Sequence, residues 1–280
     1  MRWVILLGLT TVAVAGHPAE DWAGQLAAWR ERRLAALKAE DGWPSVVGLQ
    51  WLSEGANPAG AGRTQDRIGL FLLEGKRVWF EPAPGAHVRI DGKPALRQEL
   101  RPDVPGPASL ITAGSLTMFV IERGGRLGVR VRDANSPYRK AFHGIDYYPA
   151  NPDYRVQARL VRQGKRRLSF ATVIDGLREE MDSPGILEFH LKGVDCSLEA
   201  ALSGGRLFLI FKDQTSGKTT YPAGRFLYAD LPQDGKVMLD FNQAINPPCA
   251  FTPYATCPLP PTQNKLLVAV EAGELTYHYE

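Results

Sequence analysis

Two stretches of the sequence concentrate charged and hydrogen-bonding side chains directly after apolar runs. They are VRVRDANSPYRKAFHGIDYYP at residues 129–149 and FKDQTSGKTTYPAGRFLYAD at residues 211–230. Arginine presents a planar fork of donors that fits a carboxylate or a phosphate, so loops rich in arginine favour the binding of an anion. We therefore predict a small-molecule site where these two loops converge beside a third segment. Its candidate ligand-binding residues are Arg132, Asp133, Ser136, Arg139, Tyr221, Arg225, Asp240 and Asn242.

The same arginines have a simpler interpretation as structural ion pairs. Arg132 would pair with Asp133, and Arg225 would pair with Asp213 or Asp240, where loops end. Structural pairs also perturb charged groups, so a dense cluster of charges does not by itself define a site. The sequence leaves both interpretations open. A shared site requires Arg132 and Arg225 to lie within roughly 15 Å of each other, the reach of one small ligand.

The third segment, DFNQAINPPCAFTPYATCPLPPTQN at residues 240–264, is stiff, apolar and irregular. Its prolines fix φ, and Phe251 and Tyr254 can anchor it by burial. Its asparagines can satisfy backbone groups that an irregular buried segment leaves without partners. We predict an ordered, packed loop, here called the Pro-rich loop. It either closes one end of the β structure or forms the wall of a site.

The Pro-rich loop holds two of the three cysteines of the chain. In an oxidising compartment Cys249 and Cys257 would close a small loop as a disulfide, which contributes about 2–3 kcal/mol on the chain-entropy model. Cys196 lies between strand-like apolar residues in GVDCSLEAAL. We predict that Cys196 is free and buried, where a thiol behaves as a small hydrophobe.

Familiar motifs for phosphate, serine-nucleophile and zinc chemistry do not occur in the sequence. There is no G-x-G-x-x-G opening a helix, no P-loop, no G-x-S-x-G and no H-E-x-x-H. The five histidines are isolated, without the pairing that zinc sites require. We therefore predict no metal and no cofactor. The formal net charge of the chain is only +3, and its basic residues are scattered along the sequence. Because nucleic-acid binding requires a basic patch, we predict no nucleic-acid partner.

The N-terminus has the pattern of a secretory signal. MRWVILLGLTTVAVAG combines an early Arg2, an apolar run and Ala13-Val14-Ala15, the small-x-small pattern before a cleavage site. The apolar run is shorter than the ~20 residues that span a bilayer. We predict a signal peptide at residues 1–15, a periplasmic or secreted mature chain, and no stable membrane span after cleavage. A retained N-terminal anchor is the alternative.

The remaining sequence changes from a helical to a strand pattern near Trp43. Apolar residues recur on one face in the segment that contains Trp22, Leu26 and Leu37, which predicts an amphipathic helix within residues 16–42, packed on the domain. From residue 43 to residue 280, short apolar runs alternate with turn pairs such as Gly124-Gly125 and Gly204-Gly205. We predict one mainly β domain there, an antiparallel β-sandwich or partly closed barrel.

Four phrases, in this order, resemble the bacterial DUF1684 family: GWPSVVGLQWLSEG, VRDANSPYRKAFHGIDYYPANPDYRV, TTYPAGRFLYAD and DFNQAINPPCAFTPYATCPLPPTQNKL. The resemblance covers nearly all of the mature chain, and the last phrase is the most distinctive. The family is an uncharacterised domain, so the resemblance implies no reaction. It implies recurring motif positions at Arg132, Asp133, Ser136, Arg139, Arg225, Phe226, Asp240, Asn242, Asn246, Cys249 and Cys257.

The chain departs from the family pattern at two positions. Pro222 stands where members typically have glycine, and Ile245 stands where tyrosine is usual. A chemical role that depended on that tyrosine hydroxyl would be missing here. The resemblance also implies members without a signal peptide, in which the two loop cysteines would stay thiols. Metal or thiol chemistry at Cys249 and Cys257 therefore stays open beside the predicted disulfide.

Three classes of function are consistent with these features. The first is an exported protein that binds a small polar or anionic ligand near the arginine-rich loops and the Pro-rich loop. The second is a hydrolase of unknown substrate, with Asp240, Asp213 or the Cys249 thiolate as nucleophile or base. The third is a structural or assembly factor of the cell envelope. The sequence does not fix the ligand or the oligomeric state.

Overall fold

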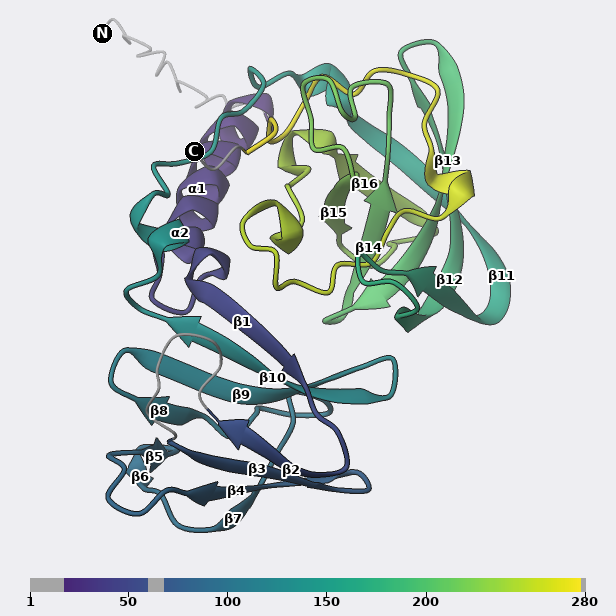
Figure 1. Cartoon of the computed structure of the whole chain (residues 1–280). Helices are drawn as coiled ribbons and strands as arrows, with labels where there is room; N and C mark the ends of the chain where they lie inside the picture. Colours follow the sequence, from purple (N-terminus) through teal and green to yellow (C-terminus); the bar gives the residue numbers. More distant parts are fainter. Residues whose placement is uncertain (1–17, 60–67, 278–280) are drawn as a thin grey trace, which may run out of the picture.

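The computed structural model describes residues 18–59 and 68–277 of the chain. The predicted signal peptide at residues 1–15 lies outside the described residues. The described part consists of one long helix and two groups of antiparallel strands. In Figure 1 the first group lies below, the second at the upper right, and the helix beside the second group.

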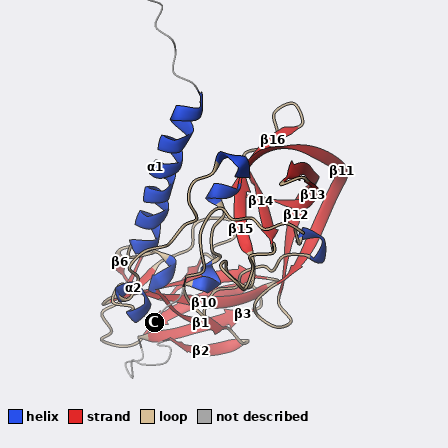
Figure 2. Cartoon of the chain, turned by 90° about the horizontal axis from the view of Figure 1, so that it is seen from above, coloured by secondary structure: helices blue, strands red, loops and turns tan. Residues whose placement is uncertain are grey.

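The N-terminal helix is α1 (Pro18–Lys38), which lies along one side of the molecule (Figure 2). Leu26 and Leu37 are buried on its inner face. The same face carries Arg30 and Arg33, because the positions 26, 30, 33 and 37 fall on one stripe of a 3.6-residue helix. The predicted helix is therefore confirmed, with a buried face that also carries two cations.

The first group of strands forms two sheets. One has the order β1-β10-β9-β8-β5-β6 and the other the order β2-β3-β4-β7. Their apolar faces share one core, in which Phe71, Phe80 and Val129 are almost fully buried. The bounds are β1 (Val46–Trp51), β2 (Gly55–Ala59), β3 (Gly69–Glu74), β4 (Arg77–Pro82), β5 (Arg89–Ile90), β6 (Lys93–Pro94), β7 (Gln98–Leu100), β8 (Ile111–Ala113), β9 (Leu116–Arg123) and β10 (Arg126–Asp133).

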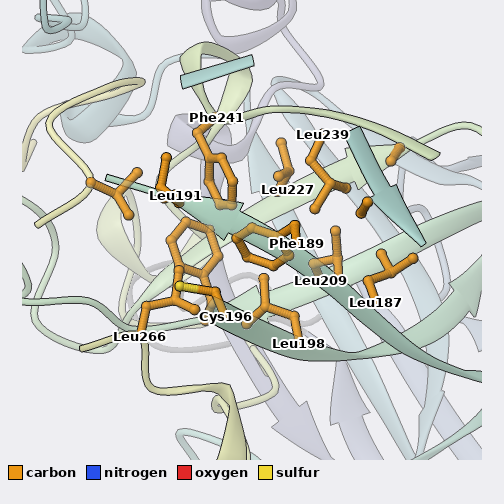
Figure 3. Packing of buried hydrophobic residues seen from close by; sticks show 14 of the residues in the cluster. Leu187, Phe189, Leu191, Cys196, Leu198, Leu209, Leu227, Leu239, Phe241 and Leu266 are labelled. Atoms are coloured by element: carbon orange, nitrogen blue, oxygen red, sulfur yellow. The ribbon is translucent and has the colours of Figure 1, made fainter. Parts of the chain in front are cut away.

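The second group is a six-stranded half-barrel with the order β15-β14-β13-β12-β11-β16. Its long strand β11 curves strongly around one end (Figure 2) and pairs with both β12 and β16. Leucine and phenylalanine side chains, among them Leu198 and Phe241, fill its interior (Figure 3). The bounds are β11 (Arg155–Ala171), β12 (Arg178–Leu191), β13 (Val194–Ser203), β14 (Arg206–Phe211), β15 (Arg225–Ala229) and β16 (Lys236–Asp240).

The fold is thus mainly antiparallel β with a half-barrel sheet and an N-terminal helix, which confirms the predicted fold class. The two hairpins expected at glycine pairs form as β9–β10 and β13–β14. Their turns place Gly124, Gly125, Gly204 and Gly205 at positive φ, where a side chain would be strained. The single domain over residues 43–280 stays a prediction, which calorimetric unfolding in one or in two transitions would test.

Short helices connect these elements and shape the Pro-rich loop. Asn242, Asn246 and Asn264 in this loop have no exposed surface and hydrogen-bond to backbone groups of other segments. The loop is therefore ordered and packed, as predicted. The connecting helices are η1 (Trp43–Ser45), α2 (Pro137–Lys140), η2 (Pro152–Tyr154), η3 (Phe241–Gln243), η4 (Pro248–Ala250) and η5 (Thr262–Asn264). Within the described ranges, no helix has the length and apolarity needed to span a membrane.

Candidate functional site

Arg225 is the first residue of β15 and has no exposed surface. Its Nη2 donates to Asp213 Oδ2 at 2.9 Å and to the Val270 carbonyl at 2.8 Å. Its Nη1 donates to the Ala272 carbonyl. Burial lowers the pKa of Arg225, and the Asp213 carboxylate raises it. This geometry is the structural ion pair that the sequence offered as an alternative, sealed inside the second group of strands.

Ser136 and Arg139 connect α1 to the strands. Arg139 Nε donates to the carbonyls of Lys38 and Ala39 at 3.1 and 3.3 Å, so it caps the last turn of α1. Ser136 Oγ donates to the Pro44 carbonyl at 2.7 Å and accepts from the Arg139 backbone N–H. Asp133 accepts from the backbone N–H of Asn135 in a local turn. These contacts hold the backbone between α1 and β10 in place. They occupy most of the hydrogen-bonding groups of the three side chains, so few are left for a ligand.

Asp240 and Asn242 lie beneath the N-terminal end of α1. Trp22 Nε1 donates to Asp240 Oδ2 at 2.7 Å, and the Asn242 side chain donates to Asp240 Oδ1 at 2.8 Å. Asn242 also exchanges two hydrogen bonds with the backbone of Asn151. Tyr221 donates its hydroxyl proton to the Cys249 carbonyl at 3.0 Å and so holds the Pro-rich loop.

The hydrogen bonds and ion pairs of the predicted residues form separate groups. Among the described residues, no hydrogen bond or ion pair joins the group Arg132, Asp133, Ser136 and Arg139 to the group Arg225, Asp240 and Asn242. Most of these polar side chains hydrogen-bond to backbone N–H and carbonyl groups that the turns leave without a partner. Polar residues next to strands often have this role. Arg132 and Arg225 each have a buried Nε without a hydrogen-bond partner, but Arg225 is paired with Asp213 through its Nη2.

Arg132 shares one face of β10 with Arg130, since both alternate with the core residues Val129 and Val131. Arg130 is only 3% exposed. Its Nη2 reaches the Thr256 hydroxyl of the Pro-rich loop at 3.4 Å, and its Nε has no partner. The guanidinium carbon lies 5.1 Å from the centre of the Trp43 ring. Arg130 is thus a buried cation at the contact between β10 and the Pro-rich loop.

No ion pair balances Arg130 within residues 18–59 and 68–277. The nearby carboxylates of Asp103 and Glu179 pair with Arg123, at 2.6 and 3.4 Å. Burial and the Arg123 charge, opposed by the Asp103 carboxylate, together lower the pKa of Arg130 to about 10. The charge on Arg130 is therefore costly in the folded protein.

The Cys257 thiol lies near the Arg130 cation, and Cys249 lies beside Cys257. The pair lies 3.4 Å apart and is not bonded, so the predicted disulfide is wrong for this structure. The backbone N–H of Cys249 donates to Cys257 Sγ at 3.1 Å instead. Cys196 is free and buried, as predicted. The spacing of the two cysteines correctly predicted that they lie close together. The packing of the loop holds its geometry without a disulfide bond.

A surface cavity of about 660 Å³ lies elsewhere, at the irregular pairing between β11 and β12. Arg162, Arg166, Arg167 and Asp182 contribute to its lining. Arg166 there is paired at 3.1 Å with the buried Glu199 carboxylate. None of the predicted site residues lines this cavity.

Comparison with known proteins places the chain in a family. The model of the family described as "Protein of unknown function (DUF1684)" matches residues 140–275. An uncharacterized protein of Haloarcula marismortui, solved by NMR, is 35% identical over 49% of this chain and 79% of its own length, with a TM-score of 0.41. The chain belongs to the DUF1684 family. No curated protein matches it.

The DUF1684 match divides the polar clusters described above. It includes the Asp213–Arg225 pair, Asp240 and the two loop thiols, and it excludes α1 and β10 with Arg130. The sequence-based candidates did not include Arg130, although the alternation Val-Arg-Val-Arg at residues 129–132 indicates two arginines on one strand face. What the sequence lacks is any sign that this face is covered by a loop more than a hundred residues away.

The two loop thiols of this DUF1684 protein are expected to differ in reactivity. The side-chain hydrogen bond from Cys257 lowers the pKa of Cys249, whereas burial raises the pKa of Cys257 well above its usual range. Burial also raises the pKa of Cys196. Because the thiolate is the nucleophile, limiting iodoacetamide at pH 8 should alkylate Cys249 first. Peptide mapping by mass spectrometry measures this order, and faster labelling of Cys257 or Cys196 would contradict it.

Proposed function

We propose that this DUF1684 protein binds a small anion at the Arg130 site, which comprises Arg130, Arg132, Thr256 and Cys257. The observation that carries the proposal is the burial of Arg130, a residue that is 3% exposed and whose Nε has no partner. A buried cation usually has a hydrogen-bonded carboxylate beside it. The two nearby carboxylates serve Arg123 instead.

A second guanidinium strengthens the proposal. Arg132 lies two residues along the same strand, about 7 Å away by strand geometry. Its Nε is also buried and unpaired, and its guanidinium carbon lies 4.8 Å from the centre of the Phe119 ring. Stacking on aromatic rings fixes a guanidinium plane while leaving its edge available for an oxygen ligand. Two such edges on one face suit the oxygens of a carboxylate or a phosphate.

The Pro-rich loop forms the other wall of the proposed site. Thr256 contributes a hydroxyl, and the Arg130 charge is close enough to Cys257 to lower the pKa of that thiol against the larger effect of burial. Tyr221 fixes the loop through the Cys249 carbonyl. A rigid backbone around a few polar groups is the arrangement that a specific small-ligand site requires. Predicted export would place this site in the periplasm or outside the cell.

The proposal predicts that an anion stabilises the protein through Arg130. Adding inorganic phosphate at constant ionic strength should raise the Tm of the wild type, because a ligand that binds only the folded state adds RT ln(1 + [L]/Kd) of stability. Arg130→Met should abolish this rise. Differential scanning fluorimetry measures both, with acetate in parallel to compare a carboxylate with a phosphate.

Arg126→Met is the matched control. Arg126 lies on the same face of the same strand, and its guanidinium carbon lies 4.4 Å from the centre of the Trp51 ring, but its side chain is exposed. It should retain the full response to the anion. A rise in Tm that survives Arg130→Met, or no rise with either anion, would refute the Arg130 site.

A further inference from the structure

A second polar cluster lies between α1 and the second group of strands. Here it is called the Glu274 cluster, and it comprises Arg30, Arg33, Tyr147, Asn246 and Glu274. Glu274 has no exposed surface. Its carboxylate accepts from Arg33 Nε at 2.8 Å and from the Asn246 backbone N–H at 2.6 Å. Arg33 Nη2 also donates to the Asn246 carbonyl at 3.2 Å, so Arg33 ties α1 to the Pro-rich loop and to the C-terminal segment that carries Glu274.

Arg30 and Tyr147 form the second part of the Glu274 cluster. The Arg30 guanidinium carbon lies 4.4 Å from the centre of the Tyr147 ring, and its Nη2 donates to the Tyr148 carbonyl at 3.1 Å. Burial raises the pKa of Tyr147, and the Glu274 carboxylate raises it further. The Tyr147 hydroxyl therefore keeps its proton at neutral pH and remains a hydrogen-bond donor.

Several buried polar atoms of this cluster lack a hydrogen-bond partner. Arg30 Nε is a donor, and Asn246 Oδ1 is an acceptor on a residue with no exposed surface. The Tyr147 hydroxyl lies beside the Glu274 carboxylate without a hydrogen bond of good geometry. Leaving a buried donor or acceptor unmatched is costly, and native structures contain few such groups. Their gathering in one place points to a ligand that both donates and accepts.

The charges of the cluster bear on the class of ligand that it would bind. Arg33 is paired with Glu274, and the neighbouring Arg225 is paired with Asp213. The Asp240 charge acts on Arg30. Because these cations have carboxylates beside them, a further charge is not required, in contrast to the Arg130 site. We propose that the Glu274 cluster binds a neutral hydroxyl-bearing molecule, a polyol or a monosaccharide. One hydroxyl would accept from Arg30 or Tyr147 and donate to Asn246 Oδ1.

The proposal is independent of anion binding at Arg130, and it is tested with different probes. Glucose, myo-inositol and glycerol are titrated into the full chain, and its intrinsic tryptophan fluorescence, to which Trp22 and Trp29 of α1 contribute, is followed. At least one of the three should bind saturably. Tyr147→Phe removes only the hydroxyl and should weaken that binding about tenfold, the cost of one lost hydrogen bond of 1.4 kcal/mol.

Tyr148→Phe is the matched control, because it removes the hydroxyl of the next residue, which is half-buried and whose hydroxyl forms a hydrogen bond of 2.5 Å with the Thr219 hydroxyl. It should change the affinity less than twofold. The proposal is overturned if none of the three probes binds, or if Tyr147→Phe binds as tightly as the wild type. Either result would mean that only water hydrogen-bonds to these unpaired atoms. The phosphate response of the wild type and of Arg130→Met is unaffected by these outcomes.

Discussion

Replacing Arg225 with alanine is expected to lower the free energy of unfolding by about 3–5 kcal/mol, because the buried Asp213 carboxylate would lose its counter-ion. Both side chains have no exposed surface. Asp213 also accepts from Thr215 and from the Val270 backbone, so it is held in place and cannot turn to solvent. Urea unfolding followed by circular dichroism measures the loss.

Arg206→Ala is the control for this substitution. Arg206 pairs with Asp230 at 3.1 Å, but the two side chains are 45% and 88% exposed. Exposed pairs contribute less than about 1 kcal/mol, since water screens the charges. If Arg225→Ala lost no more stability than Arg206→Ala, the sealed ion pair would not be the role of Arg225, and a ligand contact would be the better account.

Replacing Arg130 with methionine should have the opposite effect and raise the free energy of unfolding, by about 1–3 kcal/mol. The reason is the absence of a counter-ion in the described structure. The difference between a pKa of about 10 and the ordinary arginine value corresponds to at most about 3.5 kcal/mol, at 1.4 kcal/mol per pKa unit. Methionine removes the charge while keeping most of the apolar stem.

The sign of this effect follows from proton linkage. A lowered pKa means that the folded state releases the proton before the unfolded state does, so stability would rise with pH above about 10. At pH 7 both states are charged and the folded state carries the full penalty. Arg130→Met removes that penalty, and a urea midpoint at pH 7 measures it. A lower midpoint than that of the wild type would show that the cation is compensated.

The sequence predicted the fold to a useful degree because its signals are local. The hairpin β9–β10 follows from alternating side chains around a glycine pair, and α1 follows from a stripe of apolar residues. The bend of β11 and its pairing with both β12 and β16 are not encoded in any such short pattern. They depend on contacts between segments that are far apart in the chain.

The candidate sites were harder to predict, because burial decides what a charged residue does. Arg225 and Arg130 both occur after or within strand-like sequence, yet Arg225 pairs with Asp213, and Arg130 forms no ion pair with any residue that the structure describes. Arg33 lies on the stripe of α1 between Leu26 and Leu37, but its partner Glu274 is 241 residues away. The disulfide prediction was right about the proximity of Cys249 and Cys257 and wrong about the bond, because the two thiols are free.

The attachment of α1 has a consequence for how the chain is made. Trp22 meets Asp240 across 218 residues, and Arg33 meets Glu274 across 241. At a synthesis rate of 5–20 residues per second, the helix waits on the order of 10–50 s before its partners leave the ribosome. Its apolar stripe is uncovered throughout that time and offers a binding surface to chaperones. Helix α1 is therefore among the last elements to reach its final place, although it is synthesised before all the strands.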